Sequence, residues 1–168
     1  MNFNQHKQRP NESVLIVPIF VGRNNAFNFI FTRSSGYDNP NWKIPGGHEE
    51  MGETPEIAAK REREEEIGLS NGLMIHKPEW LVEKPSKHHA HLGKLHKQHV
   101  FLFVTSSMVG FKTVAVDGTK TLTNRVFTLG ETSKAVSDGV PLEGHYLLRD
   151  HSSVMEKVLT APNFGIII

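Results

Sequence analysis

Three glutamates, Glu62, Glu65 and Glu66, have the side-chain types and the spacing most able to do chemistry in this sequence. Residues three and four positions apart share one face of an α-helix, so these carboxylates would crowd onto a patch about one turn long. Like charges at this spacing destabilise a helix by about a few tenths of a kcal/mol per pair, and a sequence that keeps them often binds a cation there. Oxygen ligands in a compact patch favour Mg²⁺ or Mn²⁺ over zinc. A solvated acidic face is the alternative interpretation.

The residues on either side predict the helix that would carry these glutamates. Thr54 can accept a hydrogen bond from the first free amides of a helix, and Pro55 suits the first helical position, where no amide hydrogen is needed. Gly68 is a natural stop. The sequence therefore predicts a helix between Thr54 and Gly68.

A longer pattern surrounds this predicted helix. It comprises Gly47, five residues, Glu53, seven residues, and then Arg61, Glu62, Glu65, Glu66, Gly68 and Leu69 at fixed spacing. The pattern resembles the signature of the Nudix hydrolases and matches eight of its nine defined positions. The segment Trp-x-x-Pro-Gly-Gly at residues 42–47 is similar to the lead-in to that signature.

The resemblance implies an α/β fold class, a Nudix-type α/β/α sandwich with a mixed β-sheet. It also implies a metal-dependent hydrolase that cleaves the pyrophosphate linkage of a nucleoside diphosphate derivative by attack of water on phosphorus. Glu62, Glu65 and Glu66 would then be ligands of Mg²⁺ or Mn²⁺, with a supporting contact from Glu53. Arg61 would orient the glutamates, so Glu62, Glu65 and Arg61 are the expected catalytic residues.

A general base must still take the proton of the attacking water. Glu62 is our first choice, and Glu131 and Glu143 are alternatives that the sequence leaves unranked.

The resemblance also implies a phosphate contact at Arg33, which ends a predicted strand, and Lys43 is a similar candidate; a solvated side chain is an equal alternative for each. The paired glycines Gly46 and Gly47 let the backbone approach a ligand closely. Four aromatic residues could stack on a base, although core packing is the better expectation for each: Phe29, Tyr37, Trp42 and Trp80.

Arg63 is the one mismatch, at a position where the family usually has an aliphatic residue. Ala59, Arg63 and Ile67 are four residues apart and share a helix face that should pack on the sheet. We expect Arg63 either to extend its charged end into solvent or to find a carboxylate.

Apolar patterning predicts the remaining elements. Strands are expected at 14–21, 27–32, 73–82 with an interruption at Pro78, 100–105 and 126–129, with a hairpin at 111–121 around Asp117 and Gly118. Residues 84–98 are expected to form a loop, and residues 143–159 an amphipathic helix packed on the sheet. The apolar C-terminal segment 164–168 should dock on the core.

Length and composition favour one domain at residues 13–168 after a flexible polar tail at 1–12. The absence of cysteine and of an 18-residue apolar run favours a cytoplasmic protein that does not interact with membranes. Net charge is +1, with eight acidic and three basic residues in 47–69, which suits a metal with a phosphate ligand and is too weakly basic overall for duplex nucleic acid. A homodimer is left open.

The substrate remains open between two classes. Pro85 lies sixteen residues beyond Leu69, a distance that resembles the ADP-ribose-cleaving subgroup, but a nucleoside or deoxynucleoside triphosphate is equally compatible. A non-catalytic nucleotide sensor on the same fold is the alternative function, and an isomerase is disfavoured because it usually needs a cysteine. The histidine-rich segment 87–99 could close over phosphate or, less readily, bind zinc.

Overall fold

The central strand of the molecule is β1 (Glu12–Val21), whose apolar residues from Val14 to Ile19 are buried on both faces of the sheet. The computed structural model describes residues 11–35, 41–86, 93 and 95–165. The other strands are β2 (Phe27–Ser34), β3 (Gly46–His48), β4 (Leu73–His76), β5 (Val82–Pro85), β6 (Leu95–Thr105), β7 (Val114–Asp117) and β8 (Lys120–Thr128). In the main path of the sheet the strand order is β4-β6-β1-β2-β8-β7, while β3 pairs with β1 and β5 pairs with β6. The β1–β6 pair is parallel and the other pairs are antiparallel, so the sheet is mixed, as expected.

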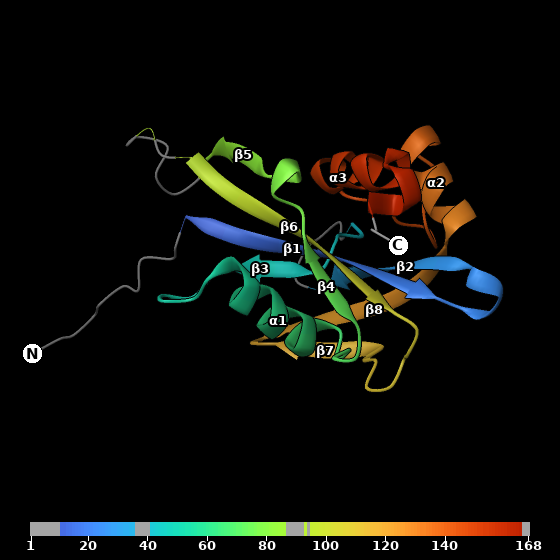
Figure 1. Cartoon of the computed structure of the whole chain (residues 1–168), viewed down its shortest axis with the longest axis horizontal. Helices are drawn as coiled ribbons and strands as arrows, with labels where there is room; N and C mark the ends of the chain where they lie inside the picture. The colour runs from blue at the N-terminus through green and yellow to red at the C-terminus, as the bar shows by residue number, and fades with distance from the viewer. Residues whose placement is uncertain (1–10, 36–40, 87–92, 94, 166–168) are drawn as a thin grey trace, which may run out of the picture.

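Helices cover both faces of this sheet (Figure 1). The helix α1 (Pro55–Glu66) packs on one face, where Ala58 and Ala59 share a core with Val14 and Ile16. The helices α2 (Leu129–Asp138) and α3 (Arg149–Thr160) cover the opposite face, over a core that includes Leu15. Successive residues of a strand point to opposite faces, so β1 supplies both cores. This arrangement confirms the predicted α/β/α sandwich.

The ends of α1 are fixed as the sequence predicts. The Thr54 hydroxyl accepts a hydrogen bond from the Ile57 amide at 3.3 Å, and Pro55 occupies the first turn. Beyond the last turn, Gly68 has a φ of +76° and its amide donates to the Arg63 carbonyl at 3.1 Å. A side chain at Gly68 would also collide with the Gly110 carbonyl oxygen, 2.2 Å from its Cβ position. Only glycine combines this backbone conformation with this close approach.

Arg63 lies on the sheet-facing side of α1, and Ala59, Arg63 and Ile67 are all buried as their spacing predicts. Its guanidinium carbon lies 4.8 Å from the centre of the Phe103 ring, and Nη2 lies 3.4 Å from Glu64 Oε1. Arg63 Nε is buried and has no hydrogen-bond partner among the described residues. Arg63 therefore reaches a carboxylate, as expected, but one donor stays unsatisfied.

We expect Arg63→Leu to raise the free energy of unfolding by about 1 kcal/mol, because it removes a buried unpaired donor and a desolvated charge. For a chain of this size the melting temperature should rise by roughly 2–4 °C, measured by calorimetry or circular dichroism. Glu64→Gln is the control: it removes the exposed partner alone and should change stability by less than about 0.5 kcal/mol. A lower melting temperature for Arg63→Leu would show that the ring contact outweighs both costs.

Several elements differ from the sequence-based expectations. The strand expected at 100–105 begins at Leu95, so part of the expected loop at 84–98 is strand β6. The strand expected at 126–129 is the end of β8, which starts at Lys120, and the helix α2 that follows was not predicted. The region 73–82 forms β4, a short 3₁₀ turn at Pro78–Trp80 and the start of β5. In the β7–β8 hairpin, Asp117 pairs with Lys120, so the loop residues are Gly118 and Thr119.

The C-terminal helix begins at Arg149 rather than at residue 143, and Phe164 beyond it packs on Phe27 with ring centres 4.7 Å apart. Residues 166–168 and most of the predicted tail, residues 1–10, lie outside the described residues. Within the part of the chain that the structure describes, no helix combines the length and apolar character needed to cross a membrane.

Candidate active site

Arg61 joins three glutamates of the signature through one guanidinium. Its Nε and Nη2 donate to the two carboxylate oxygens of Glu53 at 2.9 and 2.8 Å. Its Nη1 donates to Glu62 at 2.9 Å and to Glu65 at 3.2 Å, and Nη2 also donates to the His48 carbonyl at 3.1 Å. The hydrogen bonds from Arg61 lower the pKa of the Glu53 carboxyl, and those to Glu53 raise the pKa of Arg61. Arg61 thus holds the carboxylates of Glu53, Glu62 and Glu65 in place.

Glu62 and Glu66 lie behind two consecutive glycines. A Cβ built on Gly47 would lie 2.3 Å from Glu62 Oε1, and the Gly46 amide donates to Glu66 Oε2 at 3.1 Å. Both glutamates are buried, whereas the side chain of Glu65 is 61% exposed. A Cβ on Gly46 would lie 2.1 Å from the Val14 carbonyl oxygen. Glycine therefore avoids a collision at both positions, with the backbone of β1 at Gly46 and with the Glu62 carboxylate at Gly47.

A cavity of about 300 Å³ opens on the other side of these glycines, toward α3. Of the four residues expected to contact substrate, Lys43, Gly46 and Gly47 line it. Pro85 also contributes to the wall. Further lining residues are Ser13, Leu15, Ile44, His48, Lys84, Ser86, His96, Gln98, Leu148 and His151. The lining contains two lysines and three histidines and no acidic residue among those described, a charge distribution that attracts phosphate.

Arg33 is placed differently from the other three expected substrate residues. Its Nη1 donates to His145 Nε2 at 3.0 Å, and its guanidinium lies 5.2 Å from the centre of the Trp42 ring. Arg33 is not among the described residues that line the cavity. Trp42 is buried and its indole N–H donates to the Leu142 carbonyl at 2.7 Å, which makes it a core residue.

Two other aromatic candidates, Phe29 and Trp80, also pack on the core. Phe29 is fully buried, Trp80 packs against the core beside α2 and α3, and Tyr37 lies outside the described residues. The sequence-based preference for core packing therefore holds for the first two.

His151 is a cavity residue that sequence reasoning missed. Its Nδ1 accepts a hydrogen bond from the Ile44 amide at 2.9 Å, which requires an unprotonated nitrogen there. Burial lowers the pKa of His151 to about 4, with further lowering from Lys43 and Lys84, so the imidazole is neutral near pH 7. The sequence did contain a signal: position 151 falls on the apolar stripe of the C-terminal helix, where a histidine is out of place.

The three general-base candidates occupy different surroundings. Glu131 forms a capping box with Thr128 at the start of α2, and Glu143 lies 3.9 Å from Arg125 on the surface. Neither lines the cavity, within the described part of the chain. Glu62 is the candidate that lies next to Gly47, a residue of the cavity wall.

The sequence matches the family model described as the NUDIX domain over residues 9–142, well over half of the chain. The chain belongs to the Nudix family. This Nudix enzyme is in general terms a nucleotide pyrophosphohydrolase, and Nudix enzymes generally use divalent metals. A comparison with curated proteins gave no match.

Solved structures with the same fold are only distantly similar in sequence. A NUDIX hydrolase from Listeria monocytogenes has a TM-score of 0.62 and 18% identity, over 86% of this chain and 88% of the other. The NUDIX domain of Shewanella oneidensis NrtR, solved with ADP ribose, has a TM-score of 0.63 and 12% identity, over 87% and 84%. The Escherichia coli dihydroneopterin triphosphate pyrophosphohydrolase has a TM-score of 0.60 and 17% identity, over 90% and 96%. At these identities, the similarity shows that the Nudix chain and these proteins have the same fold.

Proposed function

We propose that this Nudix enzyme is a metal-dependent hydrolase that cleaves the pyrophosphate linkage of a nucleoside diphosphate derivative. The observation that carries the proposal is the pair Gly46 and Gly47, which separates a basic cavity from two buried signature carboxylates, Glu62 and Glu66. A diphosphate held in the cavity by Lys43 would lie next to these carboxylates.

The donor set at the signature fits a hard divalent cation. Glu62, Glu65 and Glu66 would hold Mg²⁺ or Mn²⁺ through carboxylate oxygens, with Glu53 in support. Glu62 and Glu65 already gather around a positive charge, the Arg61 guanidinium, at 2.9 and 3.2 Å. The bound cation would neutralise the charge that develops on phosphate during hydrolysis.

Side chains of the protein would bind the phosphates, position the carboxylates and accept the proton of the attacking water. Lys43 and Lys84 would bind and orient the phosphates from the cavity wall. Arg61 would hold Glu53, Glu62 and Glu65 in position. We propose Glu62 as the base that takes the proton of the attacking water, because it lies directly behind Gly47 at the edge of the cavity.

For the substrate we keep two classes, an ADP-ribose-like nucleotide sugar and a nucleoside or deoxynucleoside triphosphate. Pro85 lies in the cavity wall, and the NrtR relative was solved with ADP ribose, which favours the first class. Release of AMP or phosphate from nucleotide sugars, dinucleotides and triphosphates, with Mg²⁺ and with Mn²⁺, distinguishes them. Tight binding without product release from any of them would favour the alternative, a non-catalytic nucleotide sensor.

We expect Lys43→Gln to raise the KM of the preferred substrate about tenfold, since one charge-assisted phosphate contact contributes about 1.4 kcal/mol or more. The matched control is Lys60→Gln, which removes an exposed lysine from α1, away from the cavity lining. Steady-state kinetics on both variants provide the measurement. Equal KM values for wild type and Lys43→Gln would place the phosphates elsewhere.

We further propose that the enzyme acts on small nucleotides in the cytoplasm and not on duplex nucleic acid or membranes. The net charge of +1 argues against duplex nucleic acid, and no described helix is long and apolar enough to cross a membrane. Sedimentation at several protein concentrations would test the homodimer that the sequence leaves open.

A further inference from the structure

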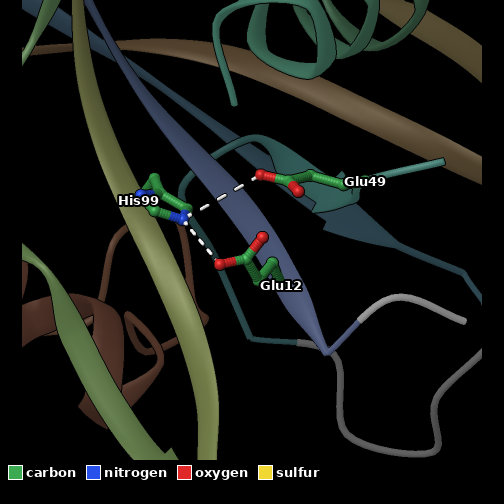
Figure 2. Close-up of side chains that lie close together, drawn as sticks. All are labelled: Glu12, Glu49 and His99. Carbon is green, nitrogen blue, oxygen red and sulfur yellow. Dashed lines mark hydrogen bonds and ion pairs between the residues drawn. The ribbon is translucent and has the colours of Figure 1, made fainter. Parts of the chain in front are cut away.

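Three ligand-type side chains that are not signature glutamates, Glu12, Glu49 and His99, lie close together (Figure 2). Glu12 begins β1, His99 lies on the neighbouring strand β6, and Glu49 directly follows β3, which pairs with β1 on its other side. One potential ligand atom from each residue lies within 4.8 Å of the others. No signature glutamate joins such a group of three among the described residues.

Of the three side chains, Glu49 has an unsatisfied buried oxygen that a metal ion or a proton could satisfy. Its side chain is 4% exposed, and Oε1 is buried without a hydrogen-bond partner among the described residues. In Figure 2 the Glu49 carboxylate points toward His99, with Oε1 at 4.0 Å from His99 Nε2, and Glu12 Oε1 lies 3.5 Å from the same nitrogen. A buried carboxylate beside a second carboxylate is costly unless a positive charge or a proton joins them.

We propose that Glu12, Glu49 and His99 form a second metal site, which binds a transition ion such as Zn²⁺ or Mn²⁺ and ties together β1, β6 and the segment leading into α1. The distances fit such an ion. Ligands about 2.1 Å from a tetrahedral metal lie about 3.4 Å from one another, close to the observed 3.5 Å between His99 Nε2 and Glu12 Oε1. The distance of 4.0 Å between His99 Nε2 and Glu49 Oε1 requires only a wider ligand–metal–ligand angle or a small shift of the Glu49 side chain.

The ligand types set the expected selectivity. An imidazole nitrogen suits Zn²⁺ and Mn²⁺ better than Mg²⁺, which prefers oxygen ligands in a strict octahedron. The competing explanation is a proton shared by the two carboxylates: burial, and then the neighbouring Glu12, raise the pKa of Glu49 to about 7. The ion would replace that proton. This site does not depend on the proposed hydrolytic function.

The test uses Mn²⁺ bound to the full chain and electron spin-echo spectroscopy, which detects a directly coordinated imidazole nitrogen. We expect the nitrogen signal in wild type and its loss in His99→Gln. The matched control is His76→Gln, which should retain the signal: His76 lies on β4, and its ring centre is 5.9 Å from that of His99. A signal that persists in His99→Gln, or that is missing in wild type, would overturn the proposal.

A second variant keeps the test independent of any folding defect in His99→Gln. In the metal-free protein, Glu49→Gln should melt at the wild-type temperature or above it, because a neutral amide avoids the cost of burying a carboxylate beside Glu12. The same variant should bind Zn²⁺ at least tenfold more weakly by calorimetry in a buffer containing excess Mg²⁺. Unchanged Zn²⁺ affinity would mean that the carboxylates only share a proton.

Discussion

Glu66→Gln should lower turnover at least a hundredfold while leaving the fold intact. A hundredfold loss corresponds to about 2.7 kcal/mol of transition-state stabilisation, a reasonable cost for one ligand charge at a catalytic cation. The glutamine oxygen can still accept the hydrogen bond that the Gly46 amide gives to Glu66 Oε2 at 3.1 Å. The substitution therefore removes charge with little change of shape. Glu65→Gln should have an effect of similar size, with even less influence on stability because Glu65 is exposed.

The measurement is kcat on the preferred substrate as a function of Mg²⁺ and Mn²⁺ concentration, with circular dichroism as the check on folding. Glu64→Gln is the matched control, since Glu64 lies on the same helix, is 61% exposed and pairs with Arg63 instead of Arg61. Near-full activity in a folded Glu66→Gln or Glu65→Gln protein would remove these residues from the ligand set.

Gly47→Ala should reduce kcat by about 10- to 100-fold through a displaced carboxylate. The new Cβ would lie 2.3 Å from Glu62 Oε1 and 2.6 Å from Glu62 Cδ, so the side chain of Glu62 must move. A shift of about 1 Å in a catalytic group can cost about a hundredfold in rate. The backbone of Gly47 is not in the left-handed region, so alanine introduces no backbone strain and the melting temperature should change little.

Kinetics and thermal melting of Gly47→Ala should be compared with Gly130→Ala at the start of α2, where an added Cβ meets nothing closer than 4.0 Å. We expect Gly130→Ala to keep wild-type kcat. If Gly47→Ala also kept it while remaining folded, the position of Glu62 would not matter for catalysis, and another base would be required.

Features that depend on local sequence were predicted well. The helix α1 was predicted because Thr54, Pro55 and Gly68 act within a few residues of the backbone they control. The helix α2 was missed although Thr128 and Glu131 have capping-box spacing, because Gly130 and few apolar residues weaken its helical pattern.

Features that depend on long-range pairing were not predictable from the sequence. The first half of β6 is polar because part of it lines the cavity, at His96 and Gln98, so its hydrophobic pattern did not indicate a strand. Glu12, Glu49 and His99 are brought together only by the register of three strands, which one sequence does not reveal. The histidine-rich segment was considered as a zinc site, but His88, His89 and His91 lie outside the described residues.

Gly46 and Gly47 also separate two groups of side chains. The acidic side chains of α1 lie on one side of them, and the side chains of β5, β6 and α3 form the cavity wall on the other. Under the proposed function, variation in that wall changes which nucleotide is accepted without moving the acids. Randomising residues 96 and 148, which leaves Lys43 and Lys84 in place for the phosphates, would therefore change substrate preference.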